Sequence, residues 1–229
     1  MQIITQSYNN PVCDEELRPM RKTVTETLAE FFPVEAVDHI ASLLEIHGVQ
    51  LHASKERVSK LGDFRPRKGA GLHRISVNAN LNKYEFLLVF LHELSHLMVY
   101  QSDGRSVLPH GKEWKAVFGR LIRECTEAQM FHPALHDQLV NYSYKVKASG
   151  VADISLAMAL RMFDKTDNGQ EWHYLEEIPE KSLFRVRSGR VFRKGEKIRK
   201  RFRCFCPESN LPYLIHSMAR VNQAGENDF

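Results

Sequence analysis

The chain has 229 residues and a formal net charge of +4, with 43% hydrophobic and 26% charged residues. This length can bury a full core and leaves room for a small second domain, and the composition is ordinary for a soluble globular protein. Four scattered cysteines do not indicate a disulfide framework.

The sequence also argues against export and membrane insertion. Residues 1–10 have neither the basic start nor the apolar core of a targeting sequence. The longest apolar segment, 86–99, is too short and too charged at its centre to span a bilayer. We therefore expect an intracellular, cytoplasmic protein without a membrane partner.

The first part of the chain predicts two helices and three short strands. Helical spacing of apolar residues covers 14–31, with Asp14 as N-cap, and 34–47, closed by Gly48. Alternating segments follow at 49–53, 58–64 and 72–77. We expect these three strands to form a small antiparallel sheet, with a mobile basic hairpin at 65–71.

The segment 86–100 predicts a buried helix that carries His92, Glu93 and His96. In a helix the two histidines lie four residues apart on one face and can chelate one zinc ion. Glu93 lies close to that metal and can take a proton from a zinc-bound water. Such residues are more often solvated or capping groups, but here they interrupt an apolar run, which favours a metal site.

A third ligand is predicted after a short loop. Gly104 and Pro109 end the first helix and let the chain turn back, and a second helix begins at about residue 112. His110 therefore precedes a helix that faces the first one, and a catalytic zinc needs this third ligand and an open fourth position. The alternative is an ordinary surface histidine.

The spacing from His92-Glu93-Leu94-Ser95-His96 to His110-Gly111-Lys112-Glu113-Trp114-Lys115 resembles the SprT family, which includes the bacterial SprT proteins and the eukaryotic Spartan proteases. Segments 60–64, 73–78 and 81–82 are similar to that family as well. The resemblance covers residues 12–124. It implies an α+β, zincin-like metalloprotease domain, zinc bound by His92, His96 and His110, and Glu93 as general base. In the Spartan branch it also implies cleavage of proteins attached or crosslinked to DNA.

The rest of the chain predicts two further helices, 133–147 and 153–164, and then a polar linker at 164–170. Beyond it, short alternating segments separated by turns predict a small β-rich domain. We expect a metalloprotease domain with a helical extension at 1–165 and a basic β-rich domain at 166–229.

The basic charge is concentrated in the second domain. Residues 185–203 carry a net charge of +9, so the remainder of the chain carries −5. A strand over 198–205 would place Arg199, Arg201 and Arg203 in one exposed row, and Lys194 and Lys197 lie just before it. Guanidinium groups suit phosphate, so we expect contacts with single-stranded or damaged DNA, as in a nucleoid-associated protein. A solvated basic face is the alternative.

The second domain departs from the family pattern, in which this part is a zinc ribbon with paired cysteine motifs. Only Cys204 and Cys206 are present here, without a partner pair, so free thiols are favoured over a second zinc. Two functional alternatives to a DNA-associated zinc endopeptidase stay open. One is a nucleic-acid-binding accessory factor with a structural metal site, and the other is a peptidase with no nucleic-acid role.

Overall fold

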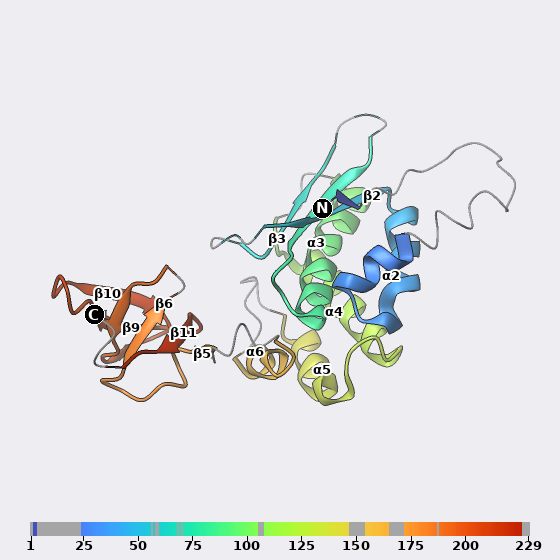
Figure 1. Ribbon diagram of the computed structural model, residues 1–229. Coiled ribbons are helices and arrows are strands. Elements are labelled where there is room, and N and C mark those ends of the chain that lie inside the picture. The colour runs from blue at the N-terminus through green and yellow to red at the C-terminus, as the bar shows by residue number, and fades with distance from the viewer. Residues whose placement is uncertain are drawn as a thin grey trace, which may run out of the picture. The chain divides into compact units, whose positions relative to one another are not determined.

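The computed structural model describes two compact units, Met1–Asp164 and Lys165–Phe229. The described residues are 2–3, 24–55, 57, 60–67, 69, 71–104, 108–146, 154–164, 172–186 and 188–225. Each unit has its own hydrophobic core, and the elements of both can be followed by colour in Figure 1. Helices and two sheets together make a mixed α+β protein, as the sequence predicts.

The first unit begins with two helical segments. Residues 24–31 are helical, and the 3₁₀ turn η1 (Val34–Ala36) leads into α2 (Val37–Ile46). Gly48 follows α2 with φ of 60°, a left-handed conformation that glycine adopts readily at a helix end. The predicted second helix is confirmed, whereas the predicted cap Asp14 lies outside the described residues.

The first unit contains a four-stranded sheet of order β1-β2-β4-β3, of which β1 precedes α2 and the other three strands follow it. Its strands are β1 (Gln2–Ile3), β2 (Val49–Ser54), β3 (Gly62–Arg65) and β4 (His73–Asn78). Strands β3 and β4 form an antiparallel hairpin, but β2 and β4 pair in parallel. The predicted purely antiparallel sheet is therefore wrong, because β4 inserts between β2 and β3. Side chains alternate in both kinds of pair, so the sequence pattern could not distinguish them.

The long helix α3 (Lys83–Asp103) contacts β3 and β4 of this sheet (Figure 1). Its N-terminus is capped by Asn82, whose side-chain oxygen accepts hydrogen bonds from the backbone N–H groups of Tyr84 (3.1 Å) and Glu85 (2.9 Å). Gly104 ends the helix with φ of 73°. The C-terminal boundary agrees with the helix end predicted at Gly104, whereas the helix begins three residues before the predicted segment 86–100.

Three more helices complete the first unit. Helix α4 (Lys112–Glu127) packs on α3, and η3 (Pro133–Leu135) with α5 (His136–Tyr144) packs on α4. Helix α6 (Ile154–Arg161) contacts η3 and α5. The core is rich in aromatic rings: Phe32 lies edge-on to Phe86 and Phe90, with centroid distances of 5.0 and 5.4 Å.

The second unit is a seven-stranded antiparallel sheet. Its strands are β5 (Trp172–Tyr174), β6 (Leu183–Val186), β7 (Val191–Arg193), β8 (Lys197–Ile198), β9 (Arg201–Phe205), β10 (Pro212–His216) and β11 (Arg220–Gln223). The order is β10-β9-β7-β6-β11-β5, with β8 on β9. Its core includes Phe184, Phe192, Phe202 and Val221. None of the helices in the described part of the chain has both the length and the apolar character that a membrane crossing requires.

Candidate metal centre

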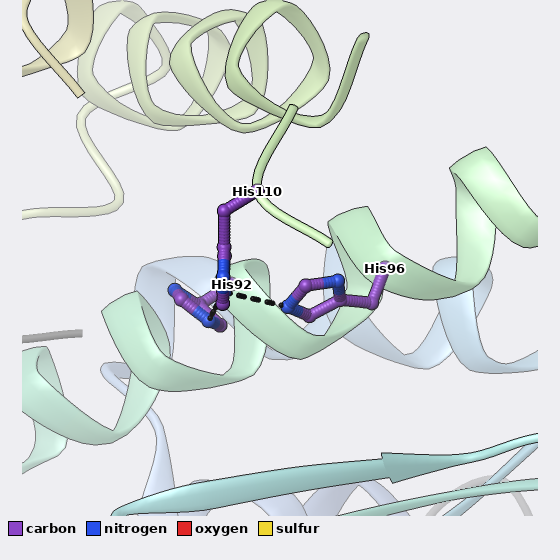
Figure 2. Close-up of side chains that lie close together, drawn as sticks. All are labelled: His92, His96 and His110. Atoms are coloured by element: carbon purple, nitrogen blue, oxygen red, sulfur yellow. Dashed lines mark hydrogen bonds between the residues drawn. The ribbon is translucent and has the colours of Figure 1, made fainter. Parts of the chain in front are cut away.

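The three predicted histidines come from two adjacent segments of the first unit. Helix α3 presents His92 and His96 one turn apart, and His110 stands two residues before α4. His110 has φ of 61°, a left-handed conformation that costs about 1–3 kcal/mol in a residue other than glycine. The turn before α4 is thus held in a sparsely populated conformation, and it directs His110 back towards α3 (Figure 2).

The Nε2 atoms of the three rings converge. His110 Nε2 lies 3.0 Å from His96 Nε2 and 3.2 Å from His92 Nε2. One ligand atom from each ring lies within 4.8 Å of the others, and no second group of this kind occurs in the described parts of the chain. A neutral imidazole has one N–H and one lone pair. Hydrogen bonds among the three converging nitrogens therefore cannot give every one of them a partner. A metal ion shared by the three lone pairs can.

The surroundings keep these imidazoles neutral, which is the form that binds metal. Burial and the neighbouring His96 and His110 lower the pKa of His92 to about 3. Burial and His110 lower the pKa of His96 to about 4. The pKa of His110 is also lowered, by burial and by the charge of Lys115. At neutral pH the cluster therefore offers three lone pairs without prior loss of a proton.

Trp114 supports all three rings from one side. Its indole lies 4.6 Å from the His92 ring, 5.2 Å from the His96 ring and 4.5 Å from the His110 ring, measured between centroids. The side chain is only 1% exposed, and its indole N–H donates to the backbone carbonyl of His92 (3.4 Å). Trp114 is therefore a core residue, and its core position orients the metal ligands.

Glu93 lies on the face of α3 that packs against β3. Its side chain is 8% exposed, and the backbone N–H of Phe64 donates to its carboxylate. Gly62 makes room for it, because a Cβ atom at position 62 would lie 2.5 Å from Glu93 Oε1 and 2.8 Å from its Cγ. Strand β3 therefore holds the Glu93 carboxylate in two ways: Gly62 leaves space for it, and the Phe64 N–H donates a hydrogen bond to it.

The environment of Glu93 raises its pKa to about 7. Burial is the main cause, because it disfavours the ionised form, and the nearby negative charge of Asp63 adds to it. The Phe64 N–H, Arg57 and Lys60 act in the opposite direction. A carboxyl group with a pKa near 7 can both accept and return a proton at neutral pH.

Two features of this centre were not assigned a role from the sequence. Gly62 lies in a segment predicted as a strand, where an isolated glycine can indicate close approach of another chain segment. The contact of Trp114 with every histidine could not be predicted, because it depends on how α4 packs on α3.

The predicted nucleic-acid contacts Lys194 and Lys197 are engaged within the second unit. Lys194 is 3% exposed, and its ammonium group donates to the backbone carbonyls of Ile178 and Glu176 and lies 4.1 Å from the ring centre of Phe202. Lys197 forms an ion pair with Glu176 at 2.5 Å. Lys194 is therefore excluded as an exposed phosphate contact, because its ammonium group is buried among these partners.

The predicted row of arginines is confirmed only in part. Arg201, Arg203 and Phe205 alternate on the exposed side of β9, and Arg203 forms an ion pair with Glu196 at 2.7 Å. Arg199 is not on the strand: it lies in the turn between β8 and β9 with φ of 56°. The turn could not be predicted from the sequence, because it consists of Arg199 and Lys200 and contains neither glycine nor proline. Whether these side chains bind nucleic acid stays a prediction.

Cys204 and Cys206 are both buried free cysteines of the second core. Free thiols were the favoured prediction, and the described residues place no group of metal-ligating side chains around them.

The segment that carries the metal centre is similar to known proteins. Residues 28–132 match the sequence model of the SprT-like family. Protein SprT of Yersinia pseudotuberculosis (serotype O:1b, strain IP 31758) is 30% identical over 106 residues, 45% of this chain and 58% of that relative. Protein SprT of Actinobacillus succinogenes is 48% identical over 52 residues, 22% of this chain and 29% of the relative.

The chain thus spans about half the length, or less, of the curated relatives it matches. No solved structure shows a significant match. The family match contains His92, Glu93, His96 and His110 together with Gly62 and Trp114. Over the segment that carries the metal centre, residues 28–132, the chain is thus similar to the SprT-like family.

Proposed function

We propose that this protein is a zinc-dependent endopeptidase. The observation that carries the proposal is the convergence of three neutral histidine nitrogens beside a buried glutamate whose pKa is about 7. Zinc at about 2.0–2.1 Å from each nitrogen, with tetrahedral angles, would separate two ligand nitrogens by about 3.3 Å. The Nε2 separations of 3.0 and 3.2 Å fit this spacing. Three histidines with an open fourth position also favour zinc over calcium or magnesium.

His92, His96 and His110 would hold the ion. When bound, zinc lowers the pKa of water and polarises a peptide carbonyl. Glu93 accepts the proton of the attacking water and then donates it to the leaving amine. Its raised pKa suits both steps, because the carboxyl group changes protonation state near neutral pH. Gly62 and the Phe64 N–H keep the carboxylate in place between the two steps.

We further propose that the first unit is zincin-like and binds its substrate along β3. This strand is an edge of the sheet, and it also holds Glu93. An extended peptide can pair with such an edge through backbone hydrogen bonds, which selects unfolded or flexible protein segments. The substrate expected from this geometry is an extended stretch of a protein chain.

The proposed site of action is protein bound or crosslinked to DNA in the cytoplasm, including the nucleoid. The support is the charge distribution, since residues 185–203 carry +9 in a chain of net charge +4. Arg199, Lys200 and Arg201 form no ion pair with an acidic side chain in the described parts of the chain. Recruitment by nucleic acid would restrict proteolysis to nearby proteins.

The test compares the purified wild type with Glu93→Gln on an unstructured protein and on a DNA-binding protein, each with and without single-stranded DNA. We expect equal zinc content and cleavage only by the wild type. Faster cleavage of the DNA-binding protein with DNA would support the proposed site of action. If DNA changes nothing, the enzyme is a peptidase without a nucleic-acid role. If zinc is bound and neither substrate is ever cut, the metal is structural.

A further inference from the structure

A basic hollow of about 460 Å³ lies where the end of α5 crosses α4 in the first unit. Helix α4 contributes Lys115 and Arg123 to its lining, and the end of α5 contributes Ser143, Tyr144 and Lys145. No lining residue is acidic. This hollow is separate from the second unit, where the sequence predicts the nucleic-acid contacts.

The hollow is built by a close contact between the two helices. A Cβ atom at Gly119 would collide with the backbone carbonyl oxygen of Ser143, so the glycine lets the end of α5 approach α4. Arg123 Nη1 donates to Ser143 Oγ at 3.3 Å, and its guanidinium carbon lies 4.9 Å from the ring centre of Tyr144. The arginine is thereby held on one face of the tyrosine ring.

The two lysines and the tyrosine ring of the hollow are exposed to solvent. Tyr144 is 72% exposed, an unusual position for a large ring with only one face covered. In the described parts of the chain, no acidic side chain forms an ion pair with Lys115, Arg123 or Lys145. Lys197 and Arg203 of the second unit differ, because both already have acidic partners.

We infer that this hollow binds a nucleotide of single-stranded nucleic acid. The cations Lys115, Arg123 and Lys145 contact the phosphates, and the open face of Tyr144 stacks on a base. A volume of about 460 Å³ accommodates one nucleotide. Lysine and arginine also bind the carboxylates of an acidic peptide, but acidic side chains supply no aromatic ring to stack on Tyr144, whereas every nucleotide does.

The position of the hollow gives this binding a consequence for proteolysis. Lys115 follows Trp114 on α4, and the ring of Trp114 contacts all three histidine rings of the metal centre. A strand bound in the hollow would pass beside the metal centre and bring an attached protein to it. This consequence rests on the proposed function, whereas the binding itself can be measured without any proteolysis.

The experiment measures the affinity of the full chain for fluorescein-labelled hexathymidylate by anisotropy at several salt concentrations. The variant Lys115→Gln/Lys145→Gln should weaken binding about tenfold and reduce the slope of log K against log salt by about 1.4, since each single-strand phosphate contact contributes about 0.7. Tyr144→Ala should weaken binding about fivefold, and Tyr144→Phe should retain it. Zinc content and thermal unfolding establish that each variant is folded.

The matched control is Lys112→Gln/Arg120→Gln. Both residues lie on α4, their side chains are 92% and 53% exposed, and neither lines the hollow. This double variant should change affinity less than twofold. An equal loss in control and test variants would overturn the inference, and so would a loss confined to Arg199→Gln/Arg201→Gln. Equal competition by hexaglutamate would show a site for acidic peptide instead. Cleavage of an unstructured protein without DNA tests the proposed function separately.

Discussion

The buried carboxyl group of Glu93 is positioned by strand β3, whereas the three histidines come from α3 and from the turn before α4. The catalytic role proposed for it predicts that Glu93→Gln retains zinc and loses cleavage by at least a factor of 100, because the amide cannot accept a proton. Zinc analysis and cleavage of an unstructured protein measure the two effects. A loss of zinc together with activity would contradict this role, since it would make Glu93 part of metal binding.

The raised pKa of Glu93 predicts a pH-dependent stability effect in the metal-free protein. Its folded pKa is about 7 and its reference value 4.5, so the folded state binds the extra proton between these values. The group therefore destabilises the fold as pH rises from 4.5 through 7, by up to about 3 kcal/mol.

Glu93→Gln removes this effect in the metal-free protein. The variant should match the wild type at pH 4.5 and be more stable at pH 8, as denaturant unfolding in a chelator can measure. The difference should shrink when zinc is bound, because the positive charge of the ion favours the carboxylate. A constant difference across this range would show that Glu93 titrates normally.

Gly62 predicts a loss of activity without loss of metal. In Gly62→Ala the new Cβ would overlap the Glu93 carboxylate, so the carboxylate must move. We expect unchanged zinc content and at least a tenfold fall in cleavage rate, which corresponds to about 1.4 kcal/mol. The control is Gly71→Ala in the same hairpin, where a Cβ would meet only the flexible Arg67 side chain at 3.3 Å. Equal activity of the two variants would contradict the packing role of Gly62.

The residues of the metal centre differ in how far the sequence could predict them. His92 and His96 follow from helical spacing alone, and His110 follows from a helix stop and a helix start around it. Gly62 and Trp114 act through contacts between elements distant in sequence, for which spacing carries no information. Arg199 shows the same limit, because a two-residue turn interrupted the expected alternation.

At the scale of elements, Asn82 joins the start of α3 to the C-terminal end of α6 and the residues just after it. Its side-chain oxygen caps α3, and its amide nitrogen donates to the carbonyl of Leu160 (2.9 Å) and to Asp164 Oδ1 (2.8 Å). Asn82→Ala removes the cap and both donors, so we expect a loss of about 1–3 kcal/mol in unfolding free energy. Asn82→Ser can keep the cap and should lose less. Denaturant unfolding ranks the two, and equal losses would mean that the cap contributes nothing.

Three helix boundaries were predictable, since α2 and α3 end beside the predicted glycines Gly48 and Gly104, and α4 begins at the predicted residue 112. Strand order was not predictable. The parallel pairing arises because β2 pairs with β4 and not with β3, and alternating side chains are the same in either arrangement. The alternation of side chains along each strand thus predicts the strands but not the order in which they pair.

At the scale of the whole molecule, zinc should stabilise the first unit because it binds only the folded arrangement of three histidines. Free zinc at about 100 times its dissociation constant should add about 2.7 kcal/mol to the unfolding free energy. His96→Ala should remove this zinc-dependent shift in melting temperature. A shift of unchanged size in that variant would place the bound ion elsewhere.

The charge distribution also belongs to the whole molecule. The sequence predicts nucleic-acid contacts in the basic second unit, but several of its cations are buried or paired. The first unit, residues 1–164, has no net charge and yet contains a hollow lined by three cations. Net charge by segment could not reveal this, because the residues of the hollow come together only when α5 packs on α4.

The measurement that tests the central claim most directly is cleavage of an unstructured protein by the zinc-loaded wild type and by Glu93→Gln, with bound metal quantified in both. We predict one zinc per chain in each protein and cleavage by the wild type alone. Equal cleavage by both proteins, or zinc-loaded wild type that cuts neither this substrate nor a DNA-bound protein, would contradict the assignment of this centre as a zinc peptidase site.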